Sequence, residues 1–209
     1  MTAVTGRELS REVAAELSDL AGIVAALDAH DWEAPSLCAG WRIREVVAHI
    51  TMPARWSGPA VLAGLARSGF RWNVFADRAA RGDAQLATND LITGLRSDRL
   101  AKWRPPGGGV QGALVHAVIH GLDVTVPLRI DRQPPPERLR VVLDALAAPA
   151  SLKHFGVDIA GIELRASDID WAYGSGPVAN ADAQTLALVL SGRRQLAGLW
   201  AGQPPSGHP

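Results

Sequence analysis

The chain has 209 residues, which is enough to bury the core of one domain with a small appended lobe. Its 21 basic residues balance 21 acidic ones, which argues against a nucleic-acid-binding protein, and its single cysteine excludes an intrachain disulfide framework. No apolar run approaches the roughly 20 residues of a membrane span, and the first ten residues hold no signal-peptide core. We therefore expect a cytoplasmic protein that binds neither nucleic acid nor membranes.

The first predicted helix covers residues 6–29. Thr5 and Glu8 have the spacing of a capping box, in which a hydroxyl and a carboxylate each bond a backbone amide at the start of a helix. The apolar residues that follow at helical spacing are Leu9, Val13, Leu17, Leu20, Val24 and Leu27. Residues 30–40 contain a proline and a glycine and are predicted to form a loop.

Three more helical regions are predicted before residue 130. The second covers residues 41–69 and is interrupted by Pro53, which removes a helix hydrogen bond. The third covers residues 73–100 with a break near Gly82, and the fourth covers residues 110–126.

The pattern changes after these helices. A fifth helix is predicted through residues 139–146. It is followed by a strand at 162–167, where apolar and polar residues alternate, and by a second strand at 171–174. A closing helix is predicted over residues 181–200. The Pro/Gly-rich tail at 202–209 is expected to be disordered.

This order of elements predicts an α+β fold that is mainly α. The predicted first domain is a helical bundle that covers residues 1–150. The predicted second part is a small α/β lobe that covers residues 151–209 and includes the tail.

Two of the six histidines stand four residues apart on the fourth predicted helix. His116 and His120 therefore project from one face within reach of one ion, and Asp123 lies near the same face. Burying the two imidazoles without partners would cost roughly 1–3 kcal/mol for each unsatisfied group, and a metal ion would satisfy both. For an isolated pair at this spacing, hydrogen bonds to carbonyls or carboxylates are the favoured alternative. The zinc-protease motif is absent, because Ala117 stands where that motif has glutamate.

His49, on the second predicted helix, supplies a third ligand. Apolar residues flank it, and the second and fourth helices can be neighbours in a bundle whose facing side chains build metal sites. Three protein ligands leave a position open for water, a thiolate or substrate. We expect Asp123 to orient a histidine through its other ring nitrogen, although a fourth-ligand role is the alternative. Cys38 is expected to be structural, and Glu45, one turn before His49, to be solvated.

Three stretches of the chain resemble one known family. Residues 36–41 (SLCAGW) and 46–49 (VVAH) resemble the opening motif of the mycothiol-dependent maleylpyruvate isomerase family, which belongs to the DinB-like metalloenzymes. Residues 114–123 (LVHAVIHGLD) are similar to the second metal motif of that family. Residues 166–171 (ASDIDW) and two short motifs after them resemble its small C-terminal domain. The resemblance spans nearly the whole chain in the right order.

The resemblance implies a DinB-like four-helix bundle that holds one divalent metal at His49, His116 and His120. Zinc is the expected metal and nickel the alternative, with mycothiol as the thiol cosubstrate of a small electrophile in a monomer or homodimer. The maleylpyruvate isomerases themselves carry Glu and then His on the fourth helix, whereas position 116 is histidine here. The three imidazoles are neutral and leave the metal its full positive charge, so maleylpyruvate itself is not the expected substrate.

Three functions are compatible with these residues. The first is a mycothiol-dependent metalloenzyme of the S-transferase or isomerase type, whose metal lowers the pKa of the thiol. The second is a non-catalytic metal-binding or sensor protein, which a fourth protein ligand such as Asp123 would indicate. The third is a hydrolase that activates water and needs a carboxylate base near the metal.

Two arginines of the third predicted helix and the tryptophans are further candidates for residues near the site. Arg78 and Arg81 are weak catalytic candidates, because an arginine can hold a substrate carboxylate by two hydrogen bonds. For each of them, an exposed helix arginine is the simpler interpretation. The chain has seven tryptophans, and several are expected at contacts between lobes or in the wall of a pocket.

Overall fold

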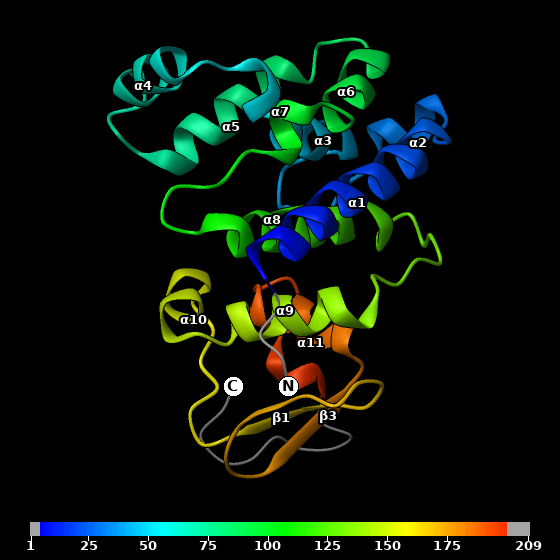
Figure 1. The fold of residues 1–209 in the computed structure, drawn as a ribbon, viewed down its shortest axis with the longest axis vertical. Coiled ribbons are helices and arrows are strands. Elements are labelled where there is room, and N and C mark those ends of the chain that lie inside the picture. The colour runs from blue at the N-terminus through cyan, green and yellow to red at the C-terminus, as the bar shows by residue number, and fades with distance from the viewer. Residues whose placement is uncertain (1–4, 200–209) are drawn as a thin grey trace. The chain divides into compact units, whose positions relative to one another are not determined.

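The structure is a computed structural model that describes residues 5–199 (Figure 1). Its internal contacts divide the chain into two compact units, residues 1–131 and 132–209. The boundary therefore falls earlier than the one at residue 150 expected from the sequence, because the helix at Pro136–Leu146 packs on the helix at Ala183–Leu190. Among the described helices, none is both long and apolar enough to cross a membrane. The predicted disordered tail lies outside the described residues.

The first unit is helical. Its elements are α1 (Gly6–Ala25), α2 (Ala29–Glu33), α3 (Ile43–Arg55), α4 (Gly58–Arg67), α5 (Trp72–Asp83), α6 (Thr88–Leu95), α7 (Asp98–Ala101) and α8 (Gly109–Thr125). Helices α1 and α3 each contact both α6 and α8, so these four close into a ring around a shared core. Helix α5 packs against α3 and carries α4. The predicted mainly α fold with a helical bundle is confirmed.

Helix α1 begins as predicted and ends earlier. The hydroxyl of Thr5 accepts from the amide of Glu8, and the carboxylate of Glu8 accepts from the amide of Thr5 at 2.7 Å, so the capping box is present. The side chain of Asp28 accepts from the amide of Asp31 at 2.8 Å and starts α2. The predicted loop at 30–40 therefore opens with a short helix.

The second and third predicted helical regions are divided by caps. Ser57 accepts from a backbone amide at the start of α4, and Ser97 does the same for α7. Pro53 stays inside α3 and does not interrupt it; the proline lacks the amide that would bond the carbonyl of His49, and the helix ends two residues later at Arg55. Helical spacing did not reveal the breaks, because the apolar pattern continues through both serines.

The second unit combines helices with a small sheet. Its elements are α9 (Pro136–Leu146), α10 (Pro149–Phe155), β1 (Glu163–Ala166), β2 (Ala172–Gly174), β3 (Val178–Ala181), α11 (Ala183–Leu190) and the 3₁₀ helix η1 (Leu196–Leu199). In the described residues the strand order is β2-β1-β3, with β2 antiparallel and β3 parallel to β1. Both predicted strands are present, whereas α10 and β3 were not predicted.

A glycine turn makes the pairing of β3 with β1 achievable. Gly176 has φ +132°, and a Cβ there would lie 2.1 Å from the carbonyl oxygen of Gly161. Only glycine fits this close approach. The predicted closing helix is shortened to α11, because Ala181 belongs to β3 and the helix ends at Leu190, shortly before Gly192 with φ +72°.

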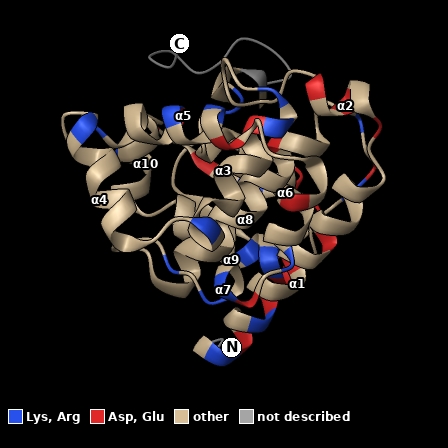
Figure 2. Ribbon diagram, turned by 90° about the horizontal axis from the view of Figure 1, so that it is seen from above, with Lys and Arg blue, Asp and Glu red and all other residues tan. Residues whose placement is uncertain are grey.

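Charges of opposite sign are mixed along α1. Figure 2 shows basic and acidic segments following one another on this helix, where Arg7, Glu8, Arg11 and Glu12 stand in the sequence. Alternating signs cancel over short distances, so α1 presents no positive stripe of the kind that follows a phosphate backbone.

We expect Gly64→Ala to destabilise the first unit. A Cβ at Gly64 would lie 2.3 Å from Cε2 of Phe75, whose side chain is only 2% exposed and packs with Met52 and Ala79. Because a buried ring has little room to move, the strain should lower the free energy of unfolding by about 1–3 kcal/mol. Urea unfolding followed by circular dichroism measures the difference.

Gly22→Ala in α1 is the matched control. A Cβ at Gly22 meets nothing within 4 Å, so the better helix former should leave stability unchanged or raise it by up to about 1 kcal/mol. Equal free energies of unfolding in the two variants would contradict the packing of α4 on α5.

Candidate metal centre

Three histidines from two neighbouring helices meet inside the first unit. His49 lies in α3, and His116 and His120 lie on consecutive turns of α8, which contacts α3. Nε2 of His49 is 3.3 Å from Nε2 of His116, and the ring centroid of His120 is 5.0 Å from that of His49 and 4.6 Å from that of His116. One nitrogen of each ring lies within 4.8 Å of the others. The structure thus brings the three predicted ligands together.

The burial of both helices places His49 inside the unit and leaves His116 and His120 half-buried. Val46, Val47 and Ile50, around His49, are fully buried, and His49 itself is 9% exposed. The central residues of α8 are also largely buried. A buried imidazole without a partner destabilises the fold, so the cluster needs hydrogen bonds or a bound ion.

Asp123 contacts the ring nitrogen Nδ1 of His120. Its carboxylate is fully buried, lies 2.8 Å from Nδ1 of His120, and accepts from the thiol of Cys38 at 3.0 Å. When Nδ1 carries the proton in this contact, Nε2 keeps its lone pair for an ion. The backbone carbonyl of Asp123 also accepts from the amide of Leu37 at 3.2 Å, which fastens the loop before α3 to α8.

His49 is held in a different way. Its Nδ1 is buried and has no hydrogen-bond partner among the described residues. The indole of Trp41 packs against its ring, with the centroids 5.1 Å apart. Burial lowers the pKa of His49 to about 3, and the charge that His120 carries when protonated adds to this effect. His49 is therefore neutral at neutral pH, which is the form that binds metals.

Two tryptophans flank the histidines, and the sequence did not single them out. Trp41 covers His49, and the ring centroid of Trp103 lies 5.2 Å from that of His116. Trp41 lies directly before α3, and Trp103 lies in the loop before α8. These positions were the signal that the sequence offered for placing them near the histidines. Each tryptophan precedes the helix that carries its histidine.

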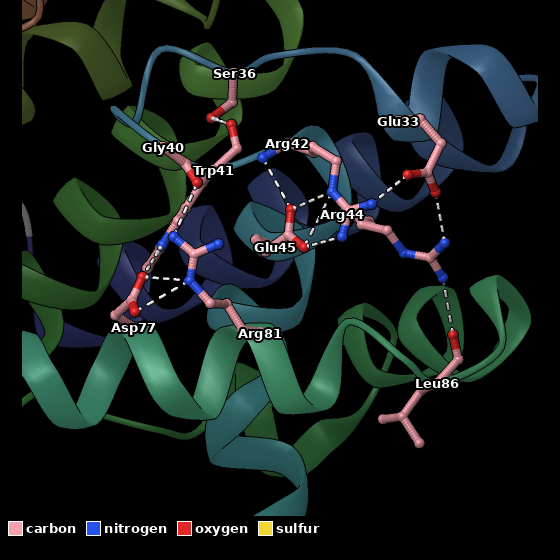
Figure 3. Close-up of polar contacts among 10 residues, drawn as sticks. All are labelled: Glu33, Ser36, Gly40, Trp41, Arg42, Arg44, Glu45, Asp77, Arg81 and Leu86. Atoms are coloured by element: carbon pink, nitrogen blue, oxygen red, sulfur yellow. Dashed lines mark hydrogen bonds and ion pairs between the residues drawn. The ribbon is translucent and has the colours of Figure 1, made fainter.

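The two arginine candidates have partners at the surface. Nε of Arg81 donates to Oδ1 of Asp77 at 2.9 Å, and its Nη2 donates to the carbonyl of Gly40 at 3.0 Å (Figure 3). Arg78 donates to the carbonyl of Arg67 at 3.2 Å. These contacts favour the simpler interpretation of exposed helix arginines, and a catalytic role for either stays a prediction.

Glu45 is not solvated, contrary to expectation. It is 2% exposed; its carboxylate accepts from the amide of Arg42 at 2.8 Å and pairs with the guanidinium, which also binds Glu33 (Figure 3). Burial alone would raise the pKa of Glu45, but hydrogen bonds from Arg42 outweigh burial and hold the pKa below its usual range. The pair fastens the first turn of α3, one turn before His49.

The sequence of residues 13–104 matches the family described as "Mycothiol maleylpyruvate isomerase N-terminal domain". This segment, which is less than half of the chain, is similar to that family. The resemblance noted from the sequence motifs is thereby confirmed. The matched range contains His49 but ends before α8, so the case for the other two histidines depends on their geometry.

Two solved structures share the fold. The crystal structure of the mycothiol-dependent maleylpyruvate isomerase is 17% identical with a TM-score of 0.62, and the match covers 98% of this chain and 99% of that one. A variant of that enzyme with one histidine replaced by alanine is 16% identical with a TM-score of 0.60 and the same coverage. No curated protein gives a significant sequence match.

We expect Glu45→Gln to lower the free energy of unfolding by about 1–3 kcal/mol at pH 7, because it removes a buried, charge-assisted contact. The pKa of Glu45 is lower in the folded state than in the unfolded state. The stabilisation is therefore complete above about pH 4.3, the unfolded value, and is lost as the pH falls through the folded pKa. Urea unfolding at neutral and acidic pH measures both effects.

Glu33→Gln is the control for this variant. The side chain of Glu33 is 45% exposed although it binds Arg42 and Arg44, and exposed ion pairs contribute little. We expect its free energy of unfolding to stay close to the wild-type value at each pH. A loss in Glu45→Gln that did not change with pH would contradict the role given to the carboxylate.

Proposed function

We propose that this protein is a divalent-metal-dependent enzyme that uses the low-molecular-weight thiol mycothiol in transfer to, or isomerisation of, a small electrophile. The observation that carries the proposal is the convergence of His49, His116 and His120 between α3 and α8. The similarity of residues 13–104 to the mycothiol maleylpyruvate isomerase N-terminal domain family supports the thiol. The histidine cluster supports the metal.

The donor set suits a zinc-like ion. Two nitrogen ligands of tetrahedral zinc, each roughly 2.0–2.1 Å from the metal, lie about 3.3–3.4 Å apart. The separation of 3.3 Å between Nε2 of His49 and Nε2 of His116 agrees with this value. Histidines that bind metals usually hydrogen-bond a carboxylate through their second ring nitrogen, as Nδ1 of His120 does with Asp123. Zinc is the metal we propose, with nickel as the alternative, since affinity alone does not distinguish them.

The residues around the ion would each have a defined task. The metal, when bound, would supply a Lewis-acidic position that lowers the pKa of a thiol. His49, His116 and His120 would hold it, and Asp123 would keep Nε2 of His120 directed at the site. The rings of Trp41 and Trp103 would shield the histidines from water. None of these side chains is required as a nucleophile.

The contacts of the carboxylates weigh against the two alternatives. A hydrolase needs a base near the metal, but Glu45 is engaged by Arg42. Asp123 would complete a closed, sensor-type site only as a fourth ligand, whereas its Oδ2 is engaged by His120 and Cys38. These observations favour a site with an open position.

Metal content tests the first part of the proposal. Untagged protein incubated with zinc and dialysed should retain about one ion per chain by elemental analysis, as expected of a three-histidine site. His49→Ala and His116→Ala should each lose most of it. His154→Ala, which changes an exposed histidine of α10, should retain the ion and serves as the control. Wild-type protein that retained neither zinc nor nickel would overturn the metal proposal.

A spectroscopic titration tests the thiol. Mycothiol added to the cobalt-substituted protein should produce a sulfur-to-cobalt charge-transfer band, because a coordinated thiol loses its proton. S-methyl-mycothiol, which has no thiol, should produce no band. The same protein should either consume mycothiol in transfer to an unsaturated electrophile or isomerise that electrophile only when mycothiol is present, and His120→Ala should do neither. Bound cobalt without either signal would exclude mycothiol and leave a metal-binding protein.

A further inference from the structure

The outward-facing nitrogens of two cluster histidines have different surroundings. Nδ1 of His120 lies against the carboxylate of Asp123. Nδ1 of His49 is buried without a hydrogen-bond partner among residues 5–199. Histidines that bind metals almost always fix this nitrogen on a carboxylate, a carbonyl or a water. Among the described residues, packing rather than a hydrogen bond at Nδ1 therefore holds the ring of His49.

The indole of Trp41 is the aromatic neighbour placed to do this. Its ring centroid is 5.1 Å from that of His49, and the two planes are tilted by 52°. An aromatic face restricts rotation of the imidazole by packing and accepts weakly from an N–H group. The restraint works only if the indole itself is held still.

Asp77, on α5, holds the indole. Nε1 of Trp41 donates to Oδ1 of Asp77 at 2.8 Å, and Arg81 binds the same carboxylate (Figure 3). Hydrogen bonds from Arg81 and then from Trp41 hold the pKa of Asp77 below its usual range, so the group is a carboxylate at neutral pH. A charged acceptor makes a stronger hydrogen bond to the indole than a neutral one.

The backbone of Trp41 is also restrained. The hydroxyl of Ser36 donates to the carbonyl oxygen of Trp41 at 2.8 Å, and Arg81 donates to the carbonyl oxygen of Gly40, the residue before it. Gly40 has φ +77°, a conformation that glycine adopts without strain. The indole is thus fixed at both its backbone and its nitrogen.

We propose that Asp77 is a positioning residue of the metal centre, which acts on His49 through Trp41. It does for His49, by way of one intervening ring, what Asp123 does directly for His120. This inference rests on the proposed function, because it assigns a task toward the metal held by the three histidines. Asp77 itself contacts neither metal nor substrate in this scheme.

Cobalt(II) titration followed by visible absorption tests the inference. Asp77→Ala removes the acceptor and should weaken cobalt binding about 10-fold and change the shape of the cobalt spectrum, as the loss of an outer partner of a ligand does. Asp77→Asn keeps an acceptor oxygen for the indole and should recover most of the wild-type affinity. Trp41→Phe keeps a ring without the donor and should resemble Asp77→Ala. The double variant should be no weaker than either single one, since both remove the same interaction.

Asp90→Ala is the matched control. It makes the same change at an exposed aspartate in the first turn of α6, and it leaves the bond from Trp41 to Asp77 in place. We expect its cobalt affinity and spectrum to match those of the wild-type protein, with circular dichroism showing that each variant is folded.

The outcomes separate the two proposals. Wild-type protein without cobalt binding would overturn the metal site and this inference with it. Wild-type binding together with unchanged affinity and spectrum in Asp77→Ala would overturn this inference alone. If Asp77→Ala does not fold, Trp41→Phe decides, and wild-type affinity and spectrum in that variant would also overturn the inference.

Discussion

Polar side chains on buried helices need partners inside the protein, and the contact between α3 and α8 is arranged around this need. His49 is 9% exposed and Asp123 is fully buried, in a region where an unsatisfied polar group costs about 1–3 kcal/mol. Asp123 accepts from both Cys38 and His120. The close approach of Nε2 of His49 to Nε2 of His116 is the part of this arrangement that a divalent ion would satisfy best.

The loop at residues 36–41 contacts Asp123, the partner of His120, and also contacts His49. One of its residues, Cys38, contacts Asp123 behind His120, and another, Trp41, contacts His49. The amide of Leu37 also bonds α8 directly. This short segment therefore contacts the surroundings of both His49 and His120. That gives a physical reason for part of the family motif to lie in a loop, beside the parts that lie in the helices that carry the ligands.

The parts of the site that follow from local spacing could be predicted from the sequence. His116 and His120 share a helix face because of the period of the helix, and the apolar residues around His49 indicated its burial. The bond between Trp41 and Asp77 could not be predicted, because the two residues are 36 positions apart and meet only through the packing of α5 on α3.

The same distinction explains the errors in the fold. The breaks before α4 and α7 depend on serine side chains turning back to cap a helix, which helical spacing does not encode. Glu45 looked solvated because a single glutamate before an apolar run is usually exposed. The burial of Glu45 is favourable because the side chain of Arg42 folds back and pairs with its carboxylate. The division between the units depends on which helix α9 packs against.

The charges of this site bear on the electrophile that the proposed enzyme would accept. Imidazoles that bind a metal are neutral, Glu45 is paired with Arg42, and among the described residues Asp123 is the carboxylate that lies against His120. With a divalent ion, the centre would keep a surplus positive charge even after the contribution of Asp123. Such a centre attracts a thiolate and an anionic electrophile through the same field. A substrate carboxylate would then not need Arg78 or Arg81, whose contacts hold them at the surface.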